Sequence, residues 1–368
     1  MTNRNAPEAM SSQSNCLEAA DGGKGRSEEP FAGLSPDAIL NAIDEALQGR
    51  GPLEGARASG QVLALNSYEN RVFQVGLEDM ASHRERPPVV VKFYRPGRWS
   101  DAQILEEHAF LEELVQAEVP AVPPLTCGGR TLQHAGEFRF AIFERRGGRA
   151  PELSDPVVRE RMGRFLGRLH VVGRRSPFLA RRQLDVATFG SEPSAYLLSH
   201  GWLPPELSSL YRDLVEQALE QVGEALACAA PVRYQRVHGD CHGGNVLWNE
   251  SGAQPGPVFV DFDDSCMAPP VQDLWMLLSG DAGEMAGQLR DVLRGYELFV
   301  PFERKELLLI EALRTLRLIH YAAWIARRWH DPAFPAAFGW FREPRYWEAR
   351  ILELREQLAA MREPPLPL

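Results

Sequence analysis

The chain has 368 residues and a formal net charge of −10, with 44% hydrophobic and 24% charged residues. These values are ordinary for a globular protein, and the length is sufficient for two lobes that each have a core. The acidic balance argues against a nucleic-acid partner, because phosphate backbones attract basic surfaces, and no apolar run approaches the ~18 residues of a membrane span.

Residues 1–30 are rich in Ser, Asn, Gly and Glu and poor in large apolar residues, so we expect a disordered tail. The start of this segment lacks the apolar stretch of a secretory signal. The five cysteines are scattered without CxxC spacing, which favours a reducing compartment and argues against a disulfide framework or a thiolate zinc site. We therefore expect a cytoplasmic protein with no membrane partner.

Residues 31–146 form a mostly β segment that we interpret as a small N-terminal lobe. A helix should begin after Ser35, which is a good N-cap, with Pro36 in its first turn. A second helix should begin at Ser100 and Asp101. The strands, recognised by β-branched and aromatic residues between turn signals, are expected within 61–75 (two strands around NSYEN), at 87–94 and at 137–144.

Residues 147–368 are predicted to form a larger, mainly helical lobe. Apolar residues three and four apart indicate helices at 157–170 and 205–226, and a short β pair is expected at 246–248 and 258–262. The predicted fold class is therefore α+β, with a small β-rich N-lobe and a helical C-lobe.

The segment RVHGDCHGGNVLW places two histidines, an aspartate and an asparagine close together and allows two interpretations. His238, Asp240 and His242 could be metal ligands of a phosphoesterase. Such a site needs further ligands from other strand ends, yet downstream only His320 and His330 remain, both in a helical segment. The metal-hydrolase interpretation is left with too few ligands.

The same segment also matches the catalytic loop of phosphoryl-transfer enzymes, in which an asparagine follows the catalytic aspartate by five residues. Asp240 and Asn245 have this spacing. Phosphoryl transfer further needs Mg²⁺ ligands and a cation on the phosphates. Asp261 lies on the next strand of the hairpin, and Lys92 stands near the end of an earlier strand. The order of these elements favours a kinase-like fold.

The stretches HGDCHGGNVLW, VDFDD and PPVQDLWMLL resemble the aminoglycoside phosphotransferase and choline kinase group. With LNSYENRVFQV, VVVKFYRPGRWSDAQILEEH and RLIHYAAWIARRWHDPAFP, they more closely resemble the bacterial stress response kinase A family. This resemblance covers nearly everything from residue 35 to about 360. It implies a two-lobed, protein-kinase-like fold and an ATP- and Mg²⁺-dependent kinase of protein serine or threonine. We expect protein acceptors, which can include the kinase itself. We expect a monomer.

Two alternatives to the protein-kinase interpretation remain open. One is a small-molecule kinase acting on an aminoglycoside, choline or a similar alcohol, and the other is a non-catalytic nucleotide-binding module. Arginines in EALRTLRLIHYAAWIARRWH disfavour a polycationic aminoglycoside. Tyr321 and Trp324 could still form a cage for choline.

The resemblance implies roles around the catalytic loop. Asp240 corresponds to the catalytic proton acceptor, and Asn245 to a Mg²⁺ ligand. Asp261 corresponds to the second Mg²⁺ ligand, the catalytic aspartate of the kinase Asp-Phe-Gly motif. We expect His238 to brace the loop by hydrogen bonds and Asp273 to tie its backbone to a helix.

The resemblance also implies a nucleotide site. Ser67 would contact ATP from the loop that covers the phosphates, and Lys92 would contact the α- and β-phosphates. Glu107 is preferred over Glu106 as the partner of Lys92, because it fits the pattern E-x-x-x-L-x-x-L. The adenine would lie against the lobe connection, at Phe143, Glu144 and Arg145.

Several features depart from better-known protein kinases. The phosphate-covering loop contains no glycine, and no activation segment follows Asp263, which replaces the glycine of Asp-Phe-Gly. Asp263 is expected either to add Mg²⁺ contacts or to be solvated. Cys241 is interpreted as a buried thiol, with an oxidant sensor as the alternative. The basic runs at 145–149 and 181–182 are expected on the solvated surface, where they could dock an acidic partner.

Overall fold

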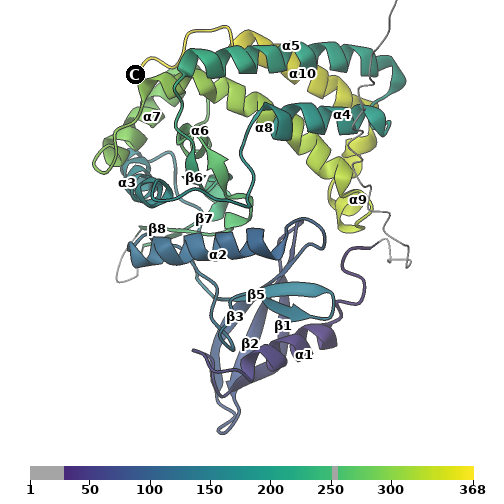
Figure 1. Ribbon diagram of the computed structural model, residues 1–368, viewed down its shortest axis with the longest axis vertical. Coiled ribbons are helices and arrows are strands. Elements are labelled where there is room, and N and C mark those ends of the chain that lie inside the picture. Colours follow the sequence, from purple (N-terminus) through teal and green to yellow (C-terminus); the bar gives the residue numbers. More distant parts are fainter. Residues whose placement is uncertain (1–28, 251–255) are drawn as a thin grey trace, which may run out of the picture.

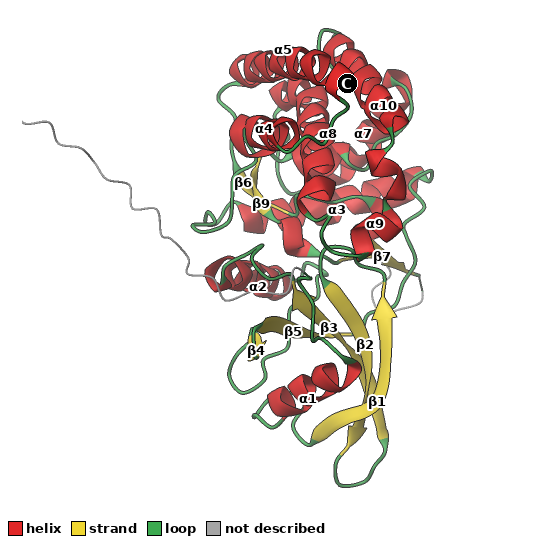
Figure 2. Cartoon of the chain, turned by 90° about the vertical axis from the view of Figure 1, so that its right-hand side faces the viewer, coloured by secondary structure: helices red, strands yellow, loops and turns green. Residues whose placement is uncertain are grey.

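A computed structural model describes residues 29–250 and 256–368 (Figure 1). The expected N-terminal tail, apart from its last two residues, lies outside the described residues, as does the middle of the turn NESGAQPGP. The rest of the chain forms a small lobe with an antiparallel sheet and a larger helical lobe (Figure 2). The expected α+β, two-lobed fold is confirmed.

The small lobe is built on a five-stranded antiparallel sheet with the order β1-β2-β3-β5-β4. Its strands are β1 (Ala56–Leu65), β2 (Arg71–Asp79), β3 (Glu85–Tyr94), β4 (Gln133–Ala135) and β5 (Phe138–Glu144). β3 is the central strand, and the register pairs Lys92 with Val72 on one side and Ala141 on the other. This central position fixes the backbone of Lys92 from both sides.

Two helices accompany this sheet. α1 (Pro36–Leu47) begins at the Ser35 cap, as expected, and packs Ile39 and Ile43 into the core of the sheet. α2 (Asp101–Gln116) begins with a capping box in which Ser100 and Gln103 bond reciprocally. Figures 1 and 2 show α2 lying between the sheet and the helical lobe. It therefore contributes to the cores of both lobes.

The helical lobe has two adjoining apolar clusters. Its helices are α3 (Pro156–Gly173), α4 (Glu192–Ser199), α5 (Pro205–Ala229), α6 (Val271–Trp275), α7 (Ala282–Tyr296), α8 (Ile310–Arg327), α9 (Ala333–Ala337) and α10 (Pro344–Ala360). α3 and α7 cross closely at Gly163, where an added Cβ would overlap the carbonyl oxygen of Val292. Glycine is needed at this crossing because any side chain would push the two helices apart.

Two short antiparallel pairs lie at the face of the helical lobe that meets the small lobe. β6 (Gln235–Val237) pairs with β9 (Cys266–Ala268), and β7 (Val246–Asn249) pairs with β8 (Gly256–Phe259). The second pair is the expected hairpin, but β8 ends before Asp261. Asp261 has φ 59°, in the left-handed region, and a 3₁₀ turn begins at Phe262. The strand therefore stops where the chain turns into the site.

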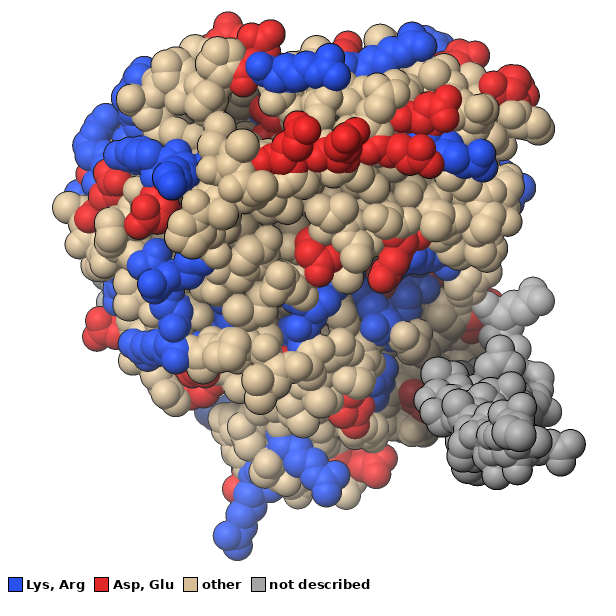
Figure 3. Space-filling view, turned by 45° about the horizontal axis from the view of Figure 1, so that its top comes forward, with Lys and Arg blue, Asp and Glu red and all other residues tan. Residues whose placement is uncertain are grey.

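Within the described residues, no helix combines the length and apolar character that a membrane span requires. On the face drawn in Figure 3, acidic and basic side chains are interspersed with broad uncharged areas. This face of the molecule, where it is described, presents no large surface of a single sign.

Candidate active site

The catalytic loop between β6 and β7 is braced by a buried aspartate. This residue is Asp273 in α6. Its carboxylate accepts hydrogen bonds from the backbone N–H groups of His238 and Gly239, at 2.8 and 2.9 Å. His170 lies 3.0 Å from the same carboxylate and is fully buried. The His238 ring lies 2.9 Å from the Val260 carbonyl oxygen. These contacts hold the loop against the strand that leads to Asp261.

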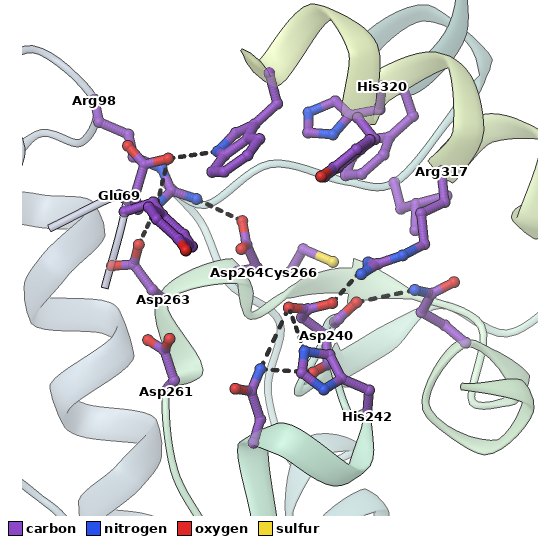
Figure 4. A pocket seen from close by; sticks show the side chains of 18 of the residues that line it. Glu69, Arg98, Asp240, His242, Asp261, Asp263, Asp264, Cys266, Arg317 and His320 are labelled. Atoms are coloured by element: carbon purple, nitrogen blue, oxygen red, sulfur yellow. Dashed lines mark hydrogen bonds and ion pairs between the residues drawn. The ribbon is translucent and has the colours of Figure 1, made fainter. Parts of the chain in front are cut away.

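Asp240 lies on this braced loop and contacts three polar side chains (Figure 4). Arg317 from α8 places Nη1 2.6 Å from its Oδ1. Asn245 donates from Nδ2 to the Asp240 carbonyl oxygen at 2.9 Å and to Oδ2 at 3.3 Å, and His242 Nε2 lies 3.5 Å from Oδ2. Burial raises the pKa of Asp240, but the His242 hydrogen bond and the Arg317 charge outweigh it and hold the pKa below its ordinary value. Asp240 is therefore an ionised carboxylate.

Lys92 reaches from β3 toward three carboxylates. Its Nζ lies 3.1 Å from Asp261 Oδ1, 3.1 Å from Asp263 Oδ1 and 3.8 Å from Glu107 Oε1. Burial lowers the pKa of Lys92, but the three negative charges outweigh it and keep the pKa well above its ordinary value. Glu106 instead accepts hydrogen bonds from the backbone N–H groups of residues 179–181. Of the two glutamates, Glu107 is thus the one beside the lysine.

Asp261 and Asp263 have different surroundings although they are two residues apart. The Asp261 side chain is 54% exposed, whereas that of Asp263 is 4% exposed and pairs with Arg98 as well as Lys92. Asp261 has a positive φ, which is unfavourable for a residue other than glycine, and such backbone strain concentrates at functional sites. The expectation of a solvated Asp263 is wrong, because this carboxylate is the buried anion that neutralises the neighbouring cations.

The expected surface position of residues 181–182 is also wrong. Arg181 is buried, and it contacts Glu107 and the Asp263 carbonyl oxygen. The Arg182 side chain is 25% exposed and lies 3.4 Å from Asp264 Oδ1. Nothing in the basic run itself distinguishes these residues from solvated arginines, because their carboxylate partners lie far away in the sequence.

Two cavities, each of about 400 Å³, meet at this site. The lysine cavity contains Lys92, Glu107, Phe143 and Glu144, and the aspartate cavity contains Asp240 and Arg317. Both are lined by the same four polar residues, Asn66, Ser67, Asn245 and Asp261. Three of the expected phosphate and Mg²⁺ residues, Ser67, Asn245 and Asp261, thus lie where the two cavities join, whereas Lys92 lines the lysine cavity alone.

One of the expected nucleotide residues lies elsewhere. Arg145 does not line the lysine cavity but donates to Gln74 Oε1 on β2 at 2.6 Å. Arg146 lines the cavity in its place. β5 ends at Glu144, and the position of this strand end cannot be read from the sequence.

The loop between β1 and β2 is fastened to the helical lobe through Glu69. Its Oε2 accepts a 2.6 Å hydrogen bond from Trp324 Nε1 and lies 2.6 Å from Arg328 Nε. Arg95 lies 3.0 Å from Oε1. Burial raises the pKa of Glu69, but Arg98, Arg328 and Arg95 outweigh it and the pKa is lowered. This contact is not expected from the sequence, in which Trp324 suggests only a cage for choline.

Cys241 lies within the catalytic loop and is fully buried. Burial raises the pKa of its thiol well above the ordinary value, and the charges of Asp273 and Asp240 raise it further. A thiolate is the reactive form of cysteine. The surroundings of Cys241 therefore favour the expected buried thiol over an oxidant sensor.

The sequence model of the phosphotransferase enzyme family matches residues 61–310. The chain belongs to the phosphotransferase enzyme family. The match to this family runs from β1 through Lys92, the catalytic loop and Asp261 to the first residue of α8.

Curated relatives narrow the assignment within the phosphotransferase enzyme family. Stress response kinase A of Escherichia coli (strain K12) is 40% identical over 338 residues, covering 92% of this chain and 97% of that protein. Serine/threonine protein kinase RdoA of Salmonella typhimurium (strain LT2) gives the same values. The resemblance to the stress response kinase A family is confirmed, and the assignment of the chain as a kinase is confirmed with it.

Solved structures of other phosphotransferases share the fold. A microcompartment-associated aminopropanol kinase superposes with a TM-score of 0.62 at 19% identity, covering 88% of this chain and 98% of that one. An amicoumacin kinase in complex with AMP-PNP and Ca²⁺ superposes with a TM-score of 0.61 at 20% identity, covering 84% and 90%. At these identities the likeness establishes the fold.

Proposed function

We propose that this protein is an ATP- and Mg²⁺-dependent kinase that phosphorylates serine or threonine residues of proteins. The observation that carries the proposal is the junction of the lysine and aspartate cavities at Ser67, Asn245 and Asp261. A phosphoryl donor in one cavity and a hydroxyl acceptor in the other would meet there. Phosphoryl transfer depends mainly on such positioning and on electrostatic stabilisation.

The lysine cavity suits a nucleotide. Lys92 would contact the α- and β-phosphates, and Glu107 would keep its ammonium in place. Ser67, with the N–H groups of its loop, would cover the phosphates in place of glycines. Phe143 and Glu144 border the cavity at the lobe connection, where the adenine would lie.

Asn245 and Asp261 supply an amide oxygen and a carboxylate at the junction. Mg²⁺ takes oxygen ligands and usually binds one or two protein carboxylates, with phosphates and waters completing its shell. In the described part of the chain, no three His, Cys, Asp or Glu side chains are grouped to hold a metal ion. When bound, Mg²⁺ would neutralise phosphate charge.

On the acceptor side, Asp240 would accept the proton of the attacking hydroxyl. Its lowered pKa keeps the carboxylate ionised, and its hydrogen bond from Asn245 orients it toward the junction. A positioned base of this kind contributes roughly 10²–10⁴ in rate.

A protein acceptor is favoured by the relatives named stress response kinase A and serine/threonine protein kinase. The alternative acceptor is a small alcohol, because the solved neighbours include aminopropanol and amicoumacin kinases. A choline cage fits poorly, since the Arg328 guanidinium lies 5.4 Å from the centre of the Trp324 ring and Tyr321 stacks on the same ring at 5.7 Å. A choline cation bound at this ring would be repelled by the positive charge of Arg328.

The proposal is tested by incubating the full chain with γ-labelled ATP and candidate proteins, with and without Mg²⁺. We expect Mg²⁺-dependent label on serine or threonine, which Asp240→Asn removes. Labelling without a divalent metal would overturn the Mg²⁺ part of the proposal. Label that persists in Asp240→Asn would overturn the role of this aspartate.

A further inference from the structure

A third cavity, of about 330 Å³, lies beside the aspartate cavity at the boundary of the two lobes. We call it the arginine cavity because its charged lining consists of five arginines and two histidines. These residues are Arg95, Arg98, Arg182, Arg327, Arg328, His320 and His330. None of its described lining residues is acidic. A cavity lined only by basic charge attracts anions.

The arginine cavity shares a wall with the aspartate cavity. Arg98, Arg182, His320 and Trp324 line both, and Figure 4 shows Arg98 and His320 at one edge of the aspartate cavity. The carboxylates that contact these arginines, Glu69 and Asp264 among them, belong to the aspartate cavity and not to this lining. The acidic charge therefore lies on the other side of the shared wall.

The carboxylates that pair with the arginines of this cavity do not fully offset them, because two of these carboxylates, Asp331 and Asp263, are shared with cations outside it. Asp331 pairs with Arg71 as well as Arg95. Asp263 pairs with Lys92 as well as Arg98. The local excess of positive charge remains on the cavity side.

Three residues that line the arginine cavity, Arg182, His320 and Arg328, show the effect of this excess positive charge. Arg182 contacts Asp264 only at 3.4 Å, and its buried Nε has no hydrogen-bond partner among the described residues. Burial lowers the pKa of His320, and the charges of Arg182, Arg328, Arg98 and Arg327 lower it further. Burial also lowers the pKa of Arg328 to about 10, with Glu69 opposing this shift and Arg98 adding to it. A bound anion would offset the positive charge around Arg182, His320 and Arg328.

We propose that the arginine cavity is a binding site for a phosphate group, either free phosphate or a phosphate monoester. Guanidinium groups bind phosphate oxygens through paired N–H donors, and the several oxygens of a phosphate group can accept from more than one arginine at once. The volume of about 330 Å³ is at the small end of ligand cavities and would hold a phosphate group or a short phosphate ester.

The phosphate group would bridge the two lobes. Arg95 and Arg98 come from the segment that follows β3 in the small lobe, whereas Arg327 and Arg328 come from the end of α8. An anion between them would offset the repulsion of cations on opposite lobes. A bound anion would therefore stabilise the observed arrangement, in which the Glu69 loop lies against Trp324.

The test uses the full chain and inorganic phosphate as the probe, with the melting temperature followed by calorimetry against sodium chloride at matched ionic strength. A ligand that binds the folded state raises this temperature in a saturable way. We expect phosphate, but not chloride, to do so. Arg327→Gln should weaken the phosphate effect several-fold, because Arg327 is exposed and lines the arginine cavity but neither the lysine cavity nor the aspartate cavity.

Arg314→Gln is the matched control, since Arg314 lies on the same helix but lines a different cavity. Equal effects of the two substitutions, or a phosphate effect no larger than that of chloride, would overturn the proposal. Repeating the titration with a serine-phosphorylated peptide and its unphosphorylated form distinguishes a phosphate monoester from free phosphate as the ligand. Tighter binding of the phosphopeptide than of free phosphate identifies a protein-borne phosphate, and equal binding identifies the free anion. These binding results do not depend on kinase activity, so they stand apart from a failure of the proposed function.

Discussion

Arg317 Nη1 lies 2.6 Å from Asp240 Oδ1, and this ion pair joins α8 to the catalytic loop. The arginine is 42% exposed in its side chain, whereas the aspartate is 22% exposed. The proposed acceptor hydroxyl would have to approach Asp240 beside this guanidinium. Arg317 thus holds the proposed base in its ionised form and borders the path of the acceptor.

Replacing Arg317 by glutamine should raise the pKa of Asp240, because burial would then meet less opposition from positive charge. Activity that needs the ionised carboxylate is lost as pH falls through that pKa. The acidic limb of the kcat/KM profile should therefore move to higher pH in Arg317→Gln. Arg314→Gln serves as the control on the same helix. Superimposable profiles for Arg317→Gln and the wild type would contradict the electrostatic role of Arg317.

Asp240→Asn should abolish turnover and leave the fold and nucleotide affinity nearly intact. The amide keeps the size of the side chain but cannot accept the hydroxyl proton, which removes roughly 10²–10⁴ in rate. The measurement is single-turnover transfer together with the dissociation constant of a non-hydrolysable nucleotide. A variant that loses nucleotide binding as strongly as turnover would indicate a structural role for Asp240.

The two adjacent glutamates of α2 should give opposite phenotypes. Glu107→Gln removes charge next to Lys92 and Arg181, so it should reduce kcat/KM. Glu106→Gln weakens the hydrogen bonds to the N–H groups of residues 179–181, so it should lower the melting temperature and change catalysis less. Steady-state kinetics and calorimetry on both variants show which glutamate supports catalysis and which supports stability. A larger kinetic defect in Glu106→Gln would show that the lysine is held differently in the working enzyme.

Glu69→Gln should loosen the loop between β1 and β2 from the helical lobe. It removes a largely buried anion, 12% exposed in its side chain, that contacts Arg95, Arg98 and Arg328, and breaking a buried pair costs up to about 3–5 kcal/mol. We expect a lower melting temperature and a higher KM for ATP. Trp324→Phe, which loses only the N–H donor, should give a milder form of both effects.

The pH dependence of this contact has a definite sign. The pKa of Glu69 is lowered in the folded protein from the ordinary 4.5, so its contribution to stability is present above that pH and is lost as the pH falls. The difference in melting temperature between the wild type and Glu69→Gln should therefore shrink toward acid pH. A difference that stays constant would show that the effect comes from packing.

Much of the fold could be predicted from local signals. Ser35 and Ser100 cap helices where expected, and the strand run before Lys92 is the centre of the sheet. The spacing from Asp240 to Asn245 survives in the structure as a direct hydrogen bond between the two side chains. These signals are readable because they depend on residues close together in the chain.

The ion-pair networks could not be predicted in this way. Asp263 looked like a solvated carboxylate, and Arg181 and Arg182 looked like surface charges, because their partners lie on other elements. The contact from Glu69 to Trp324 joins residues from opposite ends of the chain. Such pairings depend on how the two lobes meet, which no local pattern encodes.

The most direct test of the central claim compares acceptors under identical Mg²⁺·ATP conditions. The quantity is kcat/KM for phosphoryl transfer to protein serine or threonine, measured against choline, aminopropanol and a kanamycin-like aminoglycoside with the wild-type chain. We predict transfer to protein with the higher kcat/KM and no turnover of the aminoglycoside. A higher kcat/KM for any of the small alcohols would contradict the protein-kinase proposal and assign the site to a small-molecule kinase.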